Sequence, residues 1–268
     1  MSHFALLSAV RAGGRSVMAA TARGACLGLL LLAGAAYGQG GPPMVTDDPD
    51  TPGDGHWEIN FGQLGNRGSD GWLLALFDAD VNYGWGDRIQ LKIDTPYNAV
   101  QNGGGGGADW AYGLGTTQLG VKWRFYEDEG SGVKISTYPQ ASVNLDSRSA
   151  GRGLASPGHS FLLPLESSFP LPALDLDMDV EVGRNLVQDG DSEWIAGVIV
   201  ARKLGADSEL MLEGRIRSSA AGTARLANLG THWALGANTA LLAAVGHESG
   251  SAPGRSSVLY YLGVQWTH

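Results

Sequence analysis

The sequence of 268 residues has one cysteine, Cys26, and therefore no second thiol with which to form a disulfide. A disulfide framework and a structural zinc site of four thiolates are excluded. Only 17% of the residues are charged, and the formal net charge of −9 argues against nucleic acid as a partner. An apolar content of 43% is too high for a disordered chain, and 41 glycines would destabilise a mainly helical one. A folded, glycine-rich β protein remains.

Catalytic motifs are also missing. The segment Gly246–Gly250 (GHESG) places its serine one position too late for a nucleophile elbow, and His247-Glu248 lacks the second histidine of a zinc helix. The five-glycine run Gly103–Gly107 has no P-loop lysine, so we interpret it as a flexible loop. Three further histidines of the predicted mature chain, His56, His159 and His232, lie far apart along the sequence and form no recognisable metal motif. We expect no enzyme activity, no cofactor and no metal site.

No apolar run after residue 38 approaches the roughly 20 residues of a membrane helix. Residues 1–38 have the features of a cleavable export signal, with cleavage expected before Gln39. The apolar stretch Ala25–Ala36 follows three basic residues, Arg11, Arg15 and Arg23, and the length of the region before it makes Met18 an alternative start of translation. Cys26 precedes the apolar stretch, which disfavours a lipoprotein. Residues 39–55 are then a Pro/Asp-rich N-terminal segment, and residues 56–268 the folded domain.

That domain has a period of two. In the segment 77–85, for example, Phe77, Ala79 and Val81 alternate with Asp78 and Asp80. The same pattern predicts twelve strands, at about 56–62, 72–85, 88–97, 114–126, 132–144, 159–169, 174–184, 193–203, 208–218, 224–236, 239–247 and 257–268. A chain that crosses a membrane without apolar helices must form a closed barrel. We therefore predict an all-β, antiparallel transmembrane barrel of about 12 strands.

The predicted connections alternate in length. Loops are expected at 63–71, 98–113, 145–158, 185–192, 219–223 and 248–256. Tighter turns are expected at Gly86-Asp87, 127–131, 170–173, Gly205-Ala206 and Gly236-Ala237. Short periplasmic turns and longer outside loops are typical of outer-membrane barrels.

Tryptophan collects at both interfaces of a membrane, because its ring is apolar while its N–H seeks water. If the first strand starts in the periplasm, the predicted strands place all eight tryptophans near strand ends. The periplasmic rim receives Trp57, Trp85, Trp123, Trp233 and Trp266, and the outer rim receives Trp72, Trp110 and Trp194. Strand ends of other β proteins also collect aromatic residues, so this distribution supports the barrel without proving it.

The alternation also separates lipid-facing from lumen-facing residues. Leu91, Val121 and Val180 are assigned to lipid, and their polar neighbours to the lumen. The predicted pore-lining residues form a basic wall (Arg88, Lys92, Lys122, Arg124, Lys134) and an acidic one (Glu166, Asp175, Asp177, Asp179, Glu181, Glu213). Such walls would either set up a field across a water-filled lumen or pair with one another and close it.

Several segments resemble the transporter-like outer-membrane family named after the meta-pathway of phenol degradation. The resemblance lies in Gly41–Asp50 (GPPMVTDDPD), Gly55–Glu58 (GHWE), Gly113–Gly115 (GLG) and Gln118–Phe125 (QLGVKWRF). It implies an outer-membrane barrel that helps to pass small organic, often aromatic, compounds. The chain departs from the aromatic last residue usual in such barrels, since it stops at Trp266-Thr267-His268.

The acidic stretch of this resemblance permits two interpretations. Asp47, Asp48, Asp50 and Asp54 lie among prolines, which prevents a continuous strand and favours local turns at the periplasmic side or a partial plug in the barrel mouth. Closely spaced carboxylates also suit Ca²⁺, although their spacing fits no EF-hand loop.

The favoured function is an outer-membrane channel or transporter for small organic compounds. Its expected partners are outer-membrane lipid, the barrel-assembly machinery and a small-molecule solute. The alternatives are a non-conducting structural or adhesion barrel and a soluble periplasmic β-domain.

Overall fold

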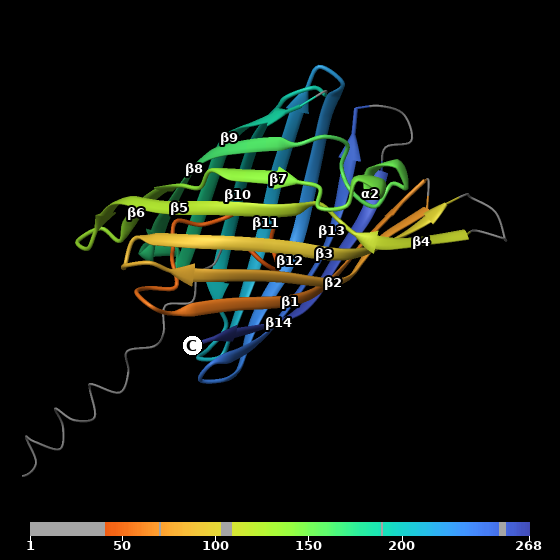
Figure 1. The fold of residues 1–268 in the computed structure, drawn as a ribbon. Coiled ribbons are helices and arrows are strands. Elements are labelled where there is room, and N and C mark those ends of the chain that lie inside the picture. Colours follow the sequence, from red (N-terminus) through yellow and green to blue (C-terminus); the bar gives the residue numbers. More distant parts are fainter. Residues whose placement is uncertain (1–40, 70, 103–108, 189, 252–255) are drawn as a thin grey trace, which may run out of the picture. The chain divides into compact units, whose positions relative to one another are not determined.

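The computed structural model describes residues 41–69, 71–102, 109–188, 190–251 and 256–268. These residues form one antiparallel barrel, drawn in Figure 1. Its strands are β1 (Trp57–Gly68), β2 (Gly71–Gly84), β3 (Ile89–Asn102), β4 (Asp109–Leu114), β5 (Thr117–Asp128), β6 (Val133–Thr137), β7 (Gln140–Val143), β8 (Ser160–Leu171), β9 (Leu176–Val187), β10 (Glu193–Lys203), β11 (Ser208–Ser219), β12 (Gly222–Gly236), β13 (Thr239–Gly250) and β14 (Ser256–Thr267). A short helix α2 (Ser147–Gly151) and a 3-10 turn η1 (Pro172–Leu174) complete the described elements.

The fourteen strands make twelve barrel positions. β4 and β5 pair with successive halves of β3, and β6 and β7 pair with successive parts of β8. Each of these pairs therefore acts as one interrupted strand. The β1–β14 pairing closes the ring, so no sheet edge is left open there. The predicted all-β, twelve-strand antiparallel barrel is confirmed.

Both interruptions have local causes. Between β4 and β5, Pro96 of the facing strand β3 has no N–H to donate, although its carbonyl accepts from the N–H of Gly115. Pro139, between β6 and β7, has no N–H to give to a neighbouring strand. Its carbonyl still accepts from Val121, and the preceding Tyr138 turns its side chain inward, where it is fully buried.

The two ends of the barrel differ. The turn end, as we call it, carries the connections 85–88, 129–132, 172–175, 204–207 and 237–238, together with the C-terminus. The loop end carries the remaining connections. Its largest described connection is 144–159, which contains α2 and lies at the same end as β4 in Figure 1.

Five of the six predicted loops are shorter than expected, and three of them show how the strands gained residues. Residues 63–68 continue β1, because a bulge between Gly62 and Leu64 shifts the phase of the alternation and hides the rest of the strand from a strict period of two. β3 runs on to Asn102 and pairs with β4, which takes both ends of the predicted loop 98–113 into strands. β12 already begins at Gly222, inside the predicted loop 219–223. The glycine run 103–107 falls almost wholly outside the described residues, as does the export signal 1–38.

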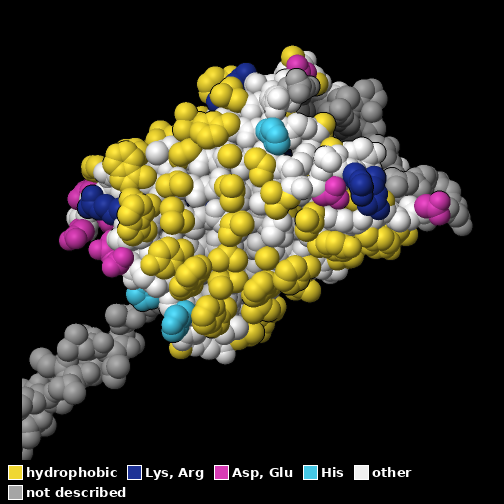
Figure 2. Space-filling model, viewed as in Figure 1, with side chains coloured by type: hydrophobic (Ala, Val, Ile, Leu, Met, Phe, Trp, Pro, Cys, Tyr) yellow, Lys and Arg dark blue, Asp and Glu magenta, His cyan; other side chains and the backbone are white. Residues whose placement is uncertain are grey.

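Alternation fixes which side chains face outward. Leu91 and Val121 are exposed on the outer surface, whereas their neighbours Gln90 and Lys122 are buried inside the barrel. Figure 2 shows an apolar band across the barrel, with charged side chains gathered towards its two ends. Such a surface is stable against hydrocarbon, not water. Among the described residues, no helix is long and apolar enough to cross a membrane.

The tryptophans lie towards the strand ends to which they were assigned. Trp57, Trp85, Trp123, Trp233 and Trp266 are towards the turn end, and Trp72, Trp110 and Trp194 are towards the loop end. Most of them are substantially exposed on the barrel surface. Their placement at a membrane interface stays a prediction.

Candidate functional site: the barrel lumen

The N-terminal segment 41–55 enters the lumen from the turn end. Gly53 lies against Gly84 of β2, where a Cβ would sit 1.8 Å from the Gly53 carbonyl oxygen. Further in, Met44 packs against Ile199 and Met211, whose side chains line the inner wall. The absent side chain at Gly84 and the apolar pocket for Met44 therefore seat the segment at two separate points.

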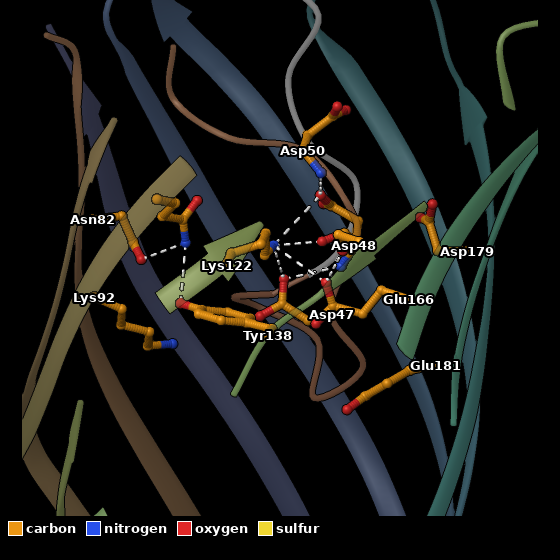
Figure 3. A network of polar contacts seen from close by, with 12 residues as sticks. Asp47, Asp48, Asp50, Asn82, Lys92, Lys122, Tyr138, Glu166, Asp179 and Glu181 are labelled. Atoms are coloured by element: carbon orange, nitrogen blue, oxygen red, sulfur yellow. Dashed lines mark hydrogen bonds and ion pairs between the residues drawn. The ribbon is translucent and has the colours of Figure 1, made fainter. Parts of the chain in front are cut away.

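Lys122 is the centre of the polar network that holds this segment (Figure 3). It projects inward from β5, is 2% exposed, and donates to Asp47 over 2.7 Å and to the carbonyl oxygen of Asp48. Its Nζ also lies 3.9 Å from carboxylate oxygens of Asp48 and of Glu166 on β8. Lys122 on β5 thus connects the N-terminal segment to Glu166 on β8.

Two further cations, Arg124 and Lys134, bind the carboxylate of Asp50. Arg124 Nη1 lies 3.0 Å from one of its carboxylate oxygens, and Lys134 Nζ lies 2.6 Å from the same oxygen. Arg124 also donates to the carbonyl of Asp87 over 2.8 Å. Asp47, Asp48 and Asp50 are therefore part of a plug inside the barrel, and their carboxylates pair with basic side chains. The fourth acid, Asp54, accepts from the N–H of Gly86 instead.

Asp47 and Asp48 are both buried, but their charged neighbours shift the pKa values of the two carboxyl groups in opposite directions. Burial by itself would raise the pKa of Asp47, but Lys122 and Lys92 outweigh it and hold that pKa below its usual value. Burial raises the pKa of Asp48, and Lys122 does not offset the combined effect of burial, Asp50 and Asp47. Asp47 is accordingly the more firmly ionised partner of Lys122.

Tyr138 forms the floor beneath the lysines. Its ring centroid lies 4.7 Å from Lys122 Nζ and 6.0 Å from Lys92 Nζ, and its hydroxyl accepts from Gln90 over 3.1 Å. The adjacent Gly120 leaves room for the ring, since a Cβ there would lie 2.8 Å from it. The ring stabilises two buried cations on the wall that the sequence marked as basic.

The opposite wall forms hydrogen bonds with the peptide backbone of the segment. Glu213 on β11 accepts from the N–H groups of Val45 and Thr46, at 3.2 and 2.6 Å to Oε1. Arg215 donates to the Thr46 hydroxyl over 3.3 Å and pairs with Glu181 of β9. Segment 41–50 therefore bridges the basic and acidic walls.

Most residues predicted to line the pore do point inward. Lys92 pairs with Asp80 over 3.2 Å, and the lumen also contains Lys122, Arg124, Lys134, Glu166, Asp179, Glu181 and Glu213. Arg88 and Asp175 are different: both lie in exposed turns at the turn end, and Asp175 has a left-handed backbone that ends η1. The predicted strands 88–97 and 174–184 began just before the observed β3 and β9, which explains both errors. Asp177 is partly exposed near the same end.

The sequence-based list omitted several residues that line the lumen. Asp78, Asp80 and Asp94 line it from β2 and β3, and the period of two already placed Asp78 and Asp80 opposite apolar neighbours. Tyr138 and Arg215 were also missed. Nothing in the alternation marks Tyr138, because it lies in the break between two strands.

The lumen stays hollow between the segment and the loop end. A cavity of about 500 Å³ is floored by residues 41–45 and lined by Asp78, Asp94, Arg215 and Tyr261 among others. A second cavity, of about 620 Å³, lies at the loop end, and Asn66 and Leu73 line both. The two together form a vestibule that ends at the N-terminal segment.

The connection 144–159 folds inward over part of this vestibule. Asn98, on the inner face of β3, donates to the carbonyl of Leu154 over 2.7 Å, and Leu154 is buried. Ser156 donates its N–H to the Thr116 hydroxyl over 2.9 Å. Asp146 caps α2 by accepting from the N–H of Arg148. The connection is thus fastened to the wall at β3 and beside β4.

Comparison with solved structures identifies the architecture. An outer-membrane channel from Pseudomonas putida F1 superposes with a TM-score of 0.65 at 11% identity, covering 82% of this chain and 98% of that one. The KdgM porin gives 0.56 at 11% identity, covering 78% and 98%, and was also solved in complex with disordered oligogalacturonate. The NanC porin gives 0.54 at 12% identity, with the same coverage. No family model matches the sequence, and no curated protein matches it.

The geometry and these likenesses agree on the fold. The chain is a transmembrane β-barrel of the outer-membrane type, with a porin-like architecture. Its lumen combines a vestibule that is large enough for a small molecule with a charged barrier of ion pairs. Such an arrangement can admit, hold and, once the barrier moves, pass a small solute.

Proposed function

We propose that this protein is an outer-membrane channel for small organic solutes, and that residues 41–50 gate it. The observation that carries the proposal is the vestibule, which leads from the loop end to a segment held mainly by side-chain contacts. Porins and a channel as structural neighbours support transport rather than catalysis. The resemblance to the phenol meta-pathway family supports aromatic compounds as the solute class.

The proposal includes an orientation and a division of the chain. Residues 1–38 act as the cleaved leader, residues 39–55 as the gate segment, and residues 56–268 as the barrel. The short turns face the periplasm, and the connection 144–159 faces outside. The tryptophans then lie at the two membrane interfaces, with lipid and the barrel-assembly machinery as partners.

One observation favours a second function. The segment 41–50 is engaged by at least five inward side chains, so the barrel could be permanently closed and serve a structural role. A conducting state distinguishes the two functions, because a structural barrel has none.

Planar-bilayer recording tests the proposal. We expect the full-length wild-type barrel to conduct weakly. A variant that carries Asp47→Asn, Asp48→Asn and Asp50→Asn should open more often, since it loses the ion pairs with Lys122, Arg124 and Lys134. Asp175→Asn, in an exposed turn, is the matched control and should behave as wild type. No conductance from any correctly folded form would favour the structural role.

A further inference from the structure

The cavity above the N-terminal segment is short of positive charge on one wall. Asp78, Asp80 and Asp94 line it from adjacent strands β2 and β3. Lys92 forms an ion pair with Asp80 over 3.2 Å. Among the described residues, neither Asp78 nor Asp94 forms an ion pair with a basic side chain.

The opposite wall offers a hydrogen-bond donor. Arg215 is 8% exposed and lines the same cavity from β11. β11 is six places from β3 in the ring of twelve, so the two strands face each other across the lumen. Arg215 uses Nη1 for Glu181 and Thr46 and also lines the cavity. Its guanidinium brings positive charge to this wall, which suits the acceptor group of a ligand.

Apolar and aromatic side chains lie between these polar walls. Leu226, Leu259 and Tyr261 line the cavity with inward side chains, whereas the neighbouring Tyr260 points outward and packs its ring against Trp72. Tyrosine faces attract ammonium groups, and more strongly where water is excluded. The described residues contain no group of three side chains able to hold a metal ion. An organic cation therefore suits the cavity better than a metal.

We propose that this cavity binds a small organic ammonium ion with an apolar body and a hydrogen-bond acceptor at its far end. The ammonium group donates to the carboxylates of Asp78 and Asp94. The apolar body lies against Leu259 and Tyr261, and the acceptor points to Arg215. The inference rests on the proposed function, since it names the class of solute for that channel.

Isothermal titration calorimetry on the detergent-solubilised full-length protein tests the site with tyramine. Its anionic counterpart, 3-(4-hydroxyphenyl)propionate, has the same phenol and reverses the charge, so it should bind at least about tenfold more weakly. 2-Phenylethylamine lacks the acceptor and should bind a few-fold more weakly. The double variant Asp78→Asn, Asp94→Asn should lose at least about tenfold in tyramine affinity. Asp177→Asn, a carboxylate outside the cavity on β9, should not change it.

Equal binding of tyramine and the propionate, or unchanged affinity in the double variant, would overturn the proposal. If the double variant does not fold, Ala75→Phe fills the cavity while keeping the carboxylates, and it should also abolish tyramine binding. Tyramine flux into liposomes is measured separately. Tyramine binding without flux would contradict the channel function and support the binding site. Flux without binding would support the channel function and contradict the binding site.

Discussion

The two halves of the lumen are built from the same alternating strands and yet differ in content. Towards the turn end, Lys122, Arg124 and Lys134 each meet a carboxylate of the N-terminal segment. Towards the loop end, two cavities remain, and carboxylates outnumber their basic partners. A polar inner face therefore does not by itself make an open pore. Whether the lumen is open depends on whether a segment of the chain enters it and pairs with the charged side chains of the wall.

The largest effect is expected at Lys122 in the closed half. Lys122→Met leaves Asp47 and Glu166 buried without their cation, which should destabilise the barrel by about 3–5 kcal/mol. The measurement is the midpoint of urea unfolding in lipid vesicles, followed by heat-dependent gel migration. Arg202→Met removes the exposed pair with Asp175 and serves as control, with a shift near zero. Equal shifts in the two variants would mean that the network around Lys122 contributes no more than a surface pair.

A smaller effect is expected where the segment enters. Gly84→Ala drives a Cβ against the Gly53 carbonyl, so the segment must shift, at a cost of about 1–3 kcal/mol. Gly214→Ala is the matched control, because its nearest neighbour would be Val198 at an ordinary 3.9 Å. Proteolysis within residues 41–55 should be faster in the first variant only. Unchanged protection would show that the segment does not depend on this contact.

The smallest effect is expected in the open half. Arg217 lies in the mouth cavity, 42% exposed at its side chain, and pairs with Glu248 over 2.9 Å. Solvent weakens such a pair, so Arg217→Gln should cost only about 0.2–1 kcal/mol. A loss as large as that of Lys122→Met, in the same unfolding assay, would remove the contrast between the two halves.

The sequence alone predicted the barrel because lipid and lumen impose opposite demands on successive residues. The alternation in β5, where Val121 faces out and Lys122 faces in, needs no tertiary information. It fails at the bulge in β1, where one extra residue reverses the phase, and at Tyr138, which lies in a break. Strand ends at Arg88 and Asp175 were misplaced by one or two residues, enough to turn exposed turn residues into lumen residues.

The closed half was harder to predict. The sequence marked Lys122 and Asp47 separately, one on a basic wall and the other in an acidic segment, but they are 75 positions apart. Turn formation, a plug and a calcium site all suited the same four acids. Only the position of the segment in the lumen, fixed by Gly84, Glu213 and the pocket for Met44, pairs three of those acids, Asp47, Asp48 and Asp50, with the basic wall.

The most direct test of the account is whether residue 45 lies inside the barrel. Val45→Cys, made with Cys26→Ser, places a single thiol on the floor of the vestibule, and Leu145→Cys in the same background places one in the exposed connection at the loop end. In detergent, both thiols should react with a small methanethiosulfonate, and only the thiol at 145 should react with a maleimide attached to a large polyethylene glycol. Equal reaction of both positions with the large reagent would place the segment outside the lumen and contradict the account.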